Sequence, residues 1–166
     1  AKKSFHIAHL DIHPEGQVLM PRLFMKSPEG FRVVDIGGQN VNYREYDGKG
    51  NTMRSFSLDR AGMNYIAEHI KTELRKNLPN DRINLDHIDF MRVIKTRKIP
   101  KITEINEYGS DINEFVEDTV LDFLDMYVFE PLQANDVDLN VTNIPTIFSV
   151  GGALTLDEYL RDEFEV

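Results

Sequence analysis

Residues 33–43 read VVDIGGQNVNY: an apolar run, an aspartate, two adjacent glycines, and then alternating apolar and polar residues. The continuous apolar run over 31–36 predicts a buried strand, and the alternation after the glycines predicts a second one. Glycine weakens a strand interior, but its missing Cβ allows another backbone or a ligand to approach closely. The stretch therefore predicts two strands joined at a glycine corner that begins with the carboxylate of Asp35.

The neighbouring sequence extends this hairpin. The DGKG turn at 47–50 predicts that residues 51–57 return antiparallel, and apolar residues at helical spacing then predict a helix over about 58–76. On the other side, weak alternation over 5–12 ends at the turn signal Pro14-Glu15-Gly16 and predicts a further strand.

The second half of the chain is mostly helical. Apolar periodicity predicts helices near 86–96 and 111–130, the latter with Ser110 as a cap and Asp111 favoured by the helix dipole. Residues 145–150 predict a strand that ends at Gly151-Gly152, and the capping box at 155–158 predicts a last helix over 155–163. This order predicts an α/β domain with a mixed sheet and flanking helices.

Length, cysteine content and charge narrow the function. The 166 residues predict one domain spanning 1–166, and the lack of cysteine excludes disulfides and zinc–thiolate sites. No apolar run approaches the ~20 residues of a membrane helix, so we expect a cytoplasmic protein without membrane contact. The net charge of -9 repels phosphates, so direct nucleic-acid binding is not expected.

A second glycine corner, Ser149–Ala153, is predicted where a strand runs directly into a helix, a place that suits an anionic ligand. At the first corner, Asp35 could hold a hydrated magnesium ion, because magnesium keeps most of its waters and needs only one or two carboxylates. A plain hairpin corner with an exposed aspartate is the alternative interpretation of the first motif alone.

The order and spacing of these motifs resemble the actin-like ATPases, and most closely the bacterial plasmid-segregation actins of the ParM/StbA type. VVDIGGQNVNYREYDGKGN at 33–51 is similar to that family's second phosphate loop and the hairpin beyond it. IFSVGGAL at 147–154 is similar to the adenosine motif, and HPEG at 13–16 to the segment whose glutamate orients the attacking water. SLDRAG at 57–62 resembles the helix start between them.

The resemblance implies a role for each matched residue. Glu15 would position the nucleophilic water, and Asp35 would bind Mg through water. The residues implied for phosphate binding are Gly37, Gly38, Gln39 and Asn40, the last standing where many relatives have threonine. The residues implied for adenosine binding are Gly62, Gly151, Gly152 and Ala153; for Gly62 a packing role is equally compatible. The implied cofactors are ATP or GTP, with Mg.

The resemblance also implies a ribonuclease H-like half of a longer actin-like ATPase, because only one phosphate loop is present. The expected function is nucleotide binding in a protein that polymerises into filaments and moves plasmid DNA through an adaptor protein. On this interpretation the chain alone would bind ATP weakly and hydrolyse little. The alternatives are half of a sugar- or acetate-kinase-type phosphotransferase, with Asp35 or a neighbour as base, or a non-catalytic interaction module.

Other polar groups have simpler explanations. The histidines at 6, 9 and 13 would not converge on a metal, because strand alternation puts residues 6 and 9 on opposite faces. The basic cluster over 92–101 predicts a solvated face or a contact with an acidic surface. The acidic stretch over 111–138, which has no Lys or Arg, predicts solvation or a filament contact.

Overall fold

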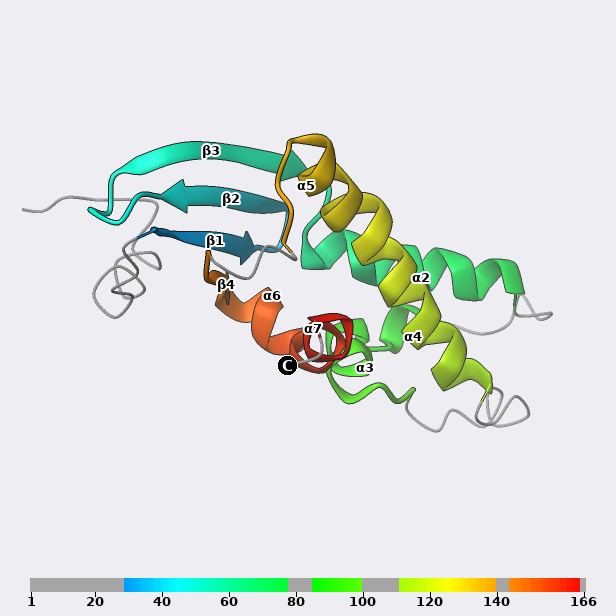
Figure 1. Ribbon diagram of the computed structural model, residues 1–166. Helices are drawn as coiled ribbons and strands as arrows, with labels where there is room; N and C mark the ends of the chain where they lie inside the picture. The colour runs from blue at the N-terminus through cyan, green and yellow to red at the C-terminus, as the bar shows by residue number, and fades with distance from the viewer. Residues whose placement is uncertain (1–28, 78–84, 100–110, 140–143, 165–166) are drawn as a thin grey trace, which may run out of the picture.

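The computed structural model describes residues 29–77, 85–99, 111–139 and 144–164. Its sheet contains β1 (Phe31–Ile36), β2 (Asn40–Tyr46), β3 (Thr52–Asp59) and β4 (Thr146–Ser149) in the order β3-β2-β1-β4. β1 and β2 pair antiparallel, as do β2 and β3, whereas β4 runs parallel to β1. The predicted mixed sheet is therefore confirmed (Figure 1).

The DGKG turn closes the β2–β3 hairpin as predicted. The Asp47 carboxylate accepts hydrogen bonds from the backbone N–H groups of Lys49 and Asn51, at 2.9 and 2.8 Å, and Gly50 adopts a φ of 82°. A left-handed φ is open to glycine at no steric cost, so the local sequence alone specifies this turn.

Helices make up the rest of the described chain. They are α2 (Met63–Asn77), the 3-10 turn η1 (Leu85–His87), α3 (Phe90–Thr96), α4 (Asp111–Leu124), the π-turn η2 (Asp125–Phe129), α5 (Glu130–Ala134), α6 (Val150–Thr155) and α7 (Asp157–Phe164). Figure 1 shows the sheet at one end of the molecule and most of the helices gathered at the other, with α5 and the start of α2 close to the sheet.

Two predicted helix starts were wrong. The helix expected from residue 58 begins at Met63, because β3 continues to Asp59 and Leu58 pairs with Val41 in the sheet. The helix expected from Asp86 begins at Phe90 after a separate 3-10 turn, and Asp89 caps it by accepting from the N–H of Arg92. Strand pairing delays the start of α2, and the Asp89 cap sets the start of α3, so apolar periodicity alone predicts neither helix start correctly.

The helix predicted over 111–130 continues through Pro131 to Ala134. Proline has no N–H to donate to the carbonyl four residues earlier. The chain widens into a π-turn just before it, and the Glu130 N–H donates to the Asp125 carbonyl. The helix thus passes the proline instead of ending at it.

The helix predicted over 155–163 corresponds to α7, which begins at Asp157. A separate helix that was not predicted, α6, starts at Val150 directly after β4, so Gly151 and Gly152 lie inside it. Thr155 ends α6, and its hydroxyl donates to the Gly151 carbonyl at 2.9 Å instead of capping α7. The apolar side predicted for the last helix is confirmed, because Leu156, Tyr159 and Leu160 are all buried.

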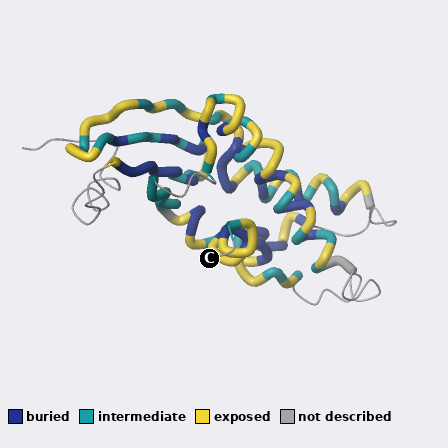
Figure 2. Tube along the Cα trace, viewed as in Figure 1, coloured by how far each residue is buried: buried dark blue, intermediate teal, exposed yellow. Residues whose placement is uncertain are grey.

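The main core lies between one face of the sheet and the helices. Its sheet residues are Val34, Ile36, Val41 and Tyr43, and the helices with their connecting segments supply the remainder (Figure 2). The opposite face of the sheet carries a second, smaller cluster of Phe31, Val33 and Tyr46, packed by Ile147. Both faces of β1, the strand that carries Asp35, therefore have buried apolar side chains.

Several predictions fall outside the described residues: the strand over 5–12, Glu15, the three histidines and the Ser110 cap. The side chain of Ile112, expected on the apolar stripe of α4, is likewise not described. Within the described ranges, the helices are too short or too polar for any of them to cross a lipid bilayer.

Candidate functional site

Parallel pairing of β1 and β4 brings the two glycine corners together. Asp35 lies opposite Ser149 in the register, and both strands end at the same edge of the sheet. The next residues are also in contact, since a Cβ on Gly152 would lie 2.3 Å from the Ile36 carbonyl oxygen. Segments more than a hundred residues apart in sequence thus form one locus, which suits a ligand site at the carboxyl ends of parallel strands.

The turn Gly37–Gln39 sits directly on the N-terminus of α2. The N–H groups of Gly62, Met63 and Asn64 donate to the carbonyls of Gln39, Gly37 and Gly38, at 3.3, 3.0 and 2.9 Å. These helix N–H groups would otherwise have no partner within the helix. The carbonyls of the turn are therefore all engaged by the helix.

Two of the three amides of the same turn have no acceptor among the described residues. Gly38 and Gln39 are exposed, and their N–H groups donate to no residue in the described part of the chain. The Gly37 N–H, by contrast, donates to the Asn40 carbonyl at 3.0 Å. Two consecutive free amides beside a helix N-terminus are the donors that an oxyanion or phosphate group requires.

Gly62 makes the docking of the turn possible. A Cβ at this position would lie 2.6 Å from the carbonyl carbons of Gly38 and Gln39. These neighbours are backbone atoms, which cannot move aside as a flexible side chain could. The packing role of Gly62 therefore has a direct structural basis, and its contact with an adenosine stays a prediction.

Asp35 is half-buried on the face of the sheet that also carries its cross-strand partner Asn42. Burial raises the pKa of its carboxyl group, while the charge of Arg44 and a hydrogen bond from Asn42 lower it in part. Carboxylates whose charged form is disfavoured by burial occur frequently at functional sites. It fits one direct or water-bridged contact to a hydrated Mg ion, and no cluster of three or more potential metal ligands occurs in the described ranges.

Asn40 is engaged within the sheet. Its side-chain amide donates to Ser57 Oγ at 2.8 Å and to Asn42 Oδ1 at 3.2 Å. The resemblance implied a phosphate contact at this position. In this structure the donor group is used to hold β2 against β3, so such a contact would require the amide to exchange partners.

The second corner divides into an open and a packed residue. Gly151 is exposed, and a Cβ there would meet nothing within 4 Å, whereas Gly152 is packed against β1. Ala153 is buried in the main core, so only its backbone could face a ligand. The three adenosine contacts implied here remain predictions, and Gly151 has the free space that such a contact requires.

Sequence reasoning missed Ser149 and Asn64. Ser149 Oγ is buried without a hydrogen-bond partner among the described residues, at the register position opposite Asp35. The side-chain amide nitrogen of Asn64, at the start of α2, lies 3.4 Å from the point that a Cβ on Gly38 would occupy. The sequence carried no signal for either residue, because both are placed by strand register and helix docking.

The chain matches no protein-family model and no curated protein. Among solved structures it is similar to MreB5 of Spiroplasma citri bound to ADP, at 20% identity and a TM-score of 0.48, over 92% of this chain and 52% of that one. It is similar to a ParM filament from Clostridium botulinum, at 12% identity and a TM-score of 0.44, over 88% of this chain and 42% of that one.

A further similarity is to the activator of 2-hydroxyisocaproyl-CoA dehydratase from Clostridium difficile with bound ADPNP. The identity is 12% and the TM-score 0.47, over 84% of this chain and 53% of that one. The chain thus spans about half the length of these three proteins, or somewhat less.

Proposed function

We propose that this chain is one nucleotide-binding half of an actin-like ATPase. The observation that carries the proposal is the Gly37–Gln39 turn: its carbonyls accept from the start of α2, and its amides at Gly38 and Gln39 have no acceptor within the described ranges. Asp35 precedes this turn, and the Ser149–Gly152 corner lies beside it. A phosphate-binding turn, a carboxylate for a metal and an open glycine then share one edge of the sheet.

Each residue has a distinct task in this proposal. The amides of Gly38 and Gln39 donate to phosphate oxygens, and Asp35 orients the waters of the Mg ion. Gly151 leaves room for the nucleoside, and Glu15 positions the attacking water. Bound Mg-nucleotide supplies the transferable phosphoryl group and the charge that offsets the leaving oxygens. Transfer to water requires mainly such positioning and charge neutralisation, so no covalent nucleophile is required.

The finer proposal is a filament-forming ATPase that segregates plasmid DNA. It rests on the sequence resemblance of residues 33–51 and 147–154 to the ParM/StbA type. A second half would close the site, self-association would form the filament, and an adaptor protein would connect it to DNA. The nucleotide is ATP or GTP.

One observation favours a second candidate, half of a sugar- or acetate-kinase-type phosphotransferase. Burial raises the pKa of Asp35, and a carboxylate of raised pKa is a better general base towards a substrate hydroxyl. The two candidates share the nucleotide site and differ in the acceptor of the phosphoryl group. Pelleting of a two-half protein with ATP would favour the filament former, and phosphorylation of an added alcohol or carboxylate would favour the kinase.

The direct test of nucleotide binding is a titration of this chain with Mg-ATP, followed by backbone amide NMR. We expect saturable shifts of the Gly38 and Gln39 amides, because these donors would meet the phosphates. Asp35→Ala should weaken binding, and the matched exposed change Asp122→Ala on α4 should leave it unchanged. Shifts confined to other parts of the chain, or none at millimolar nucleotide, would contradict the proposal and leave the non-catalytic module.

A further inference from the structure

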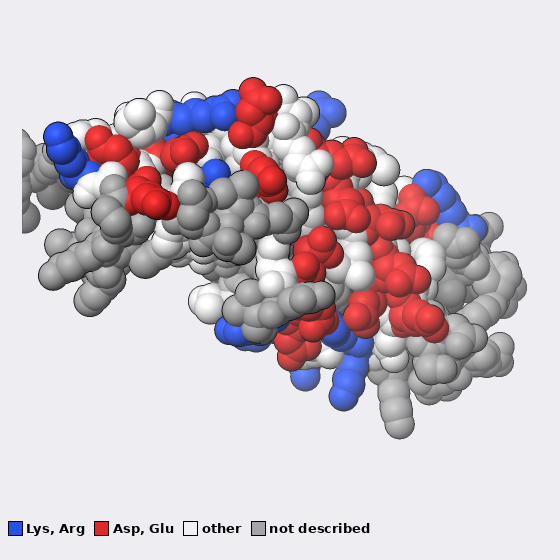
Figure 3. Space-filling view, in the orientation of Figure 1, with Lys and Arg blue, Asp and Glu red and all other residues white. Residues whose placement is uncertain are grey.

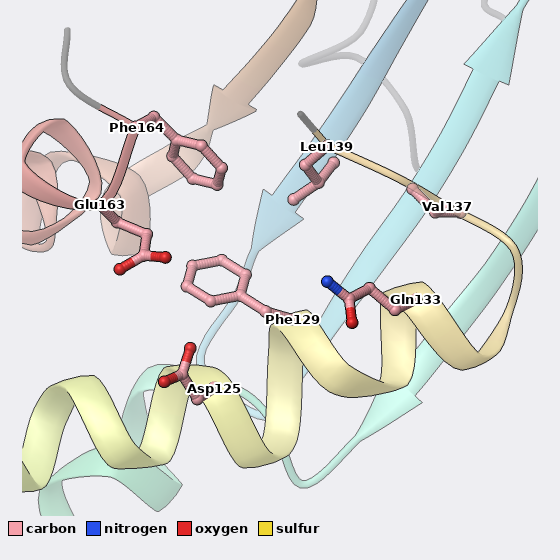
Figure 4. Close-up of a pocket in the computed structure, with 7 residues that line it drawn as sticks. All are labelled: Asp125, Phe129, Gln133, Val137, Leu139, Glu163 and Phe164. Carbon is pink, nitrogen blue, oxygen red and sulfur yellow. The ribbon is translucent and has the colours of Figure 1, made fainter. Parts of the chain in front are cut away.

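A small pocket lies between the end of the long α4–α5 helix and α7 (Figure 4), and the ring of its lining residue Phe164 lies 5.5 Å from that of Phe148 in β4. Its volume is about 90 Å³. Phe129 and Phe164 form an aromatic wall, with ring centroids 5.6 Å apart and planes at 80°. Leu139 and the buried Val137 complete the apolar part of the lining.

The pocket is flanked by carboxylates from separate elements. Asp125 comes from the first residue of the π-turn and Glu163 from α7, and Figure 4 shows both carboxylates beside the Phe129 ring. Neither carboxylate pairs with a cation in the part of the chain that the structure describes. On the same helix as Glu163, by contrast, Asp157 pairs with Arg161 and Asp162 with Arg97, at 3.0 and 2.7 Å.

This combination selects a ligand by charge and size. Two anionic groups next to an aromatic face attract an organic cation, which gains ion pairs from the carboxylates and a cation–π contact from the ring. A volume of 90 Å³ corresponds to about three water molecules, so it accepts an ammonium or guanidinium group but not a nucleotide. Gln133 also lines the pocket with a polar side-chain amide.

The surroundings favour a cation presented by a protein. Figure 3 shows acidic side chains gathered over α4 and neighbouring helices, where the sequence of α4 and η2 carries Asp118, Asp122 and Asp125 without a basic residue. A surface of one sign steers segments of the opposite sign and repels phosphates. The π-turn that positions Asp125 and Phe129 is a type of helix distortion frequent at functional sites.

We propose that this pocket receives an arginine or lysine side chain from a basic segment of a different protein. The cationic end group lies between Asp125 and Glu163 and over Phe129, while the aliphatic stem contacts Phe164 and Leu139. This docking site shares no residue with the proposed nucleotide site, so either proposal can fail alone.

The test uses this whole chain and a short capped peptide with a single arginine among glycines and alanines. We expect saturable NMR shifts of the Phe129 and Phe164 rings and the Gln133 side-chain amide, weakened by added salt. Asp125→Asn and Glu163→Gln should each raise the Kd by about two- to fivefold. The matched controls Asp122→Asn and Glu114→Gln make the same chemical changes at exposed α4 positions outside the pocket and should leave the Kd unchanged.

Three results would overturn the proposal. Equal binding of a peptide with citrulline in place of arginine would show that charge is not recognised. Binding of agmatine without binding of the peptide would assign the pocket to a small organic cation instead of a protein segment. Concentration-dependent sedimentation of the chain that is abolished by both Asp125→Asn and Arg92→Gln would assign it to a second copy. Urea denaturation of each variant checks that the fold is retained.

Discussion

At the residue scale, the adjacent glycines of α6, Gly151 and Gly152, have different structural roles. Gly152 is required by the close approach of α6 to the end of β1, whereas Gly151 faces open space. Neither glycine has the positive φ that would demand glycine for backbone reasons. The conformational freedom of glycine is therefore not the reason for this motif, and the space around each residue is what distinguishes them.

The glycine pair can be separated by alanine substitution. Gly152→Ala should lower the free energy of unfolding by about 1–3 kcal/mol, because its Cβ would overlap backbone atoms that cannot move independently. Gly151→Ala should instead stabilise by up to about 1 kcal/mol, since alanine has the higher helix propensity. Urea denaturation measures both. Equal effects of the two substitutions would contradict the tight packing of α6 on β1.

Ionisation of Asp35 should lower the free energy of unfolding as the pH rises. Burial raises its pKa above the ordinary value for an aspartate, so the folded protein binds this proton more tightly than the unfolded chain. The penalty is absent below the unfolded pKa, grows as the pH rises through the raised folded pKa, and is complete above it. Asp35→Asn should therefore flatten this decline and increase stability at pH 7, while weakening binding of Mg-nucleotide.

Urea denaturation of both proteins from pH 3 to pH 7 tests this expectation. The difference in unfolding free energy between Asp35→Asn and the original chain should widen towards neutral pH. A variant that loses stability relative to the original chain as the pH rises would mean that Asp35 is kept charged for structural reasons.

At the element scale, Arg97 connects the end of α3 to both α4 and α7. Its guanidinium pairs with Glu117 of α4 at 3.1 Å and with Asp162 of α7 at 2.7 Å, and lies 4.3 Å from the centre of the Tyr159 ring. The side chain is only 21% exposed, so these contacts are partly shielded from water. One residue of the predicted basic cluster is thus a structural connection within the chain.

Arg97→Met should lower the free energy of unfolding by about 1–3 kcal/mol, because charge-assisted hydrogen bonds are lost while the aliphatic stem is retained. Arg92→Met is the matched control: Arg92 is exposed on α3, and among the hydrogen bonds of the described residues only its backbone takes part, not its side chain. Thermal denaturation compares the two variants. A change in stability no larger than that of Arg92→Met would show that the three helices are held by apolar packing alone.

At the scale of the whole molecule, the candidate nucleotide site has one wall. The glycine corners lie at an edge of the sheet, and the turn amides at Gly38 and Gln39 are exposed. Water in such a site weakens oriented charges, which stabilise a transition state best when solvent is excluded. In our proposal a second half supplies the missing wall.

This chain alone should therefore release phosphate from ATP no faster than a buffer control. In a protein that carries both halves, Glu15→Ala should leave nucleotide binding largely intact and slow hydrolysis, since positioning the water matters mainly in the transition state. A phosphate-release assay beside calorimetry separates the two effects. Robust turnover by this chain alone would refute the one-wall proposal.

Local chemistry explains which elements were predictable. The DGKG turn, the buried strand over 31–36 and the apolar side of α7 follow from turn residues and periodicity, which act within a few neighbours. Helix boundaries were less predictable, because β3 extends by pairing with β2 and because the π-turn lets the helix pass Pro131. In each case an interaction that the local apolar pattern does not reveal moved the helix boundary.

The sequence by itself determined an α/β chain with two glycine corners and an aspartate at one of them, because strand pattern and glycine placement are local properties. Only the tertiary structure decided that these corners meet, since the parallel pairing of β1 with β4 depends on residues far apart in the chain. It also decided which turn atoms are engaged: docking of α2 uses the carbonyls of Gly37–Gln39, while the Gly38 and Gln39 amides donate to no other residue that the structure describes. Which backbone groups of a turn can still form hydrogen bonds depends on the element that packs against the turn. Here that element is the start of α2, which cannot be inferred from the residues of the turn itself.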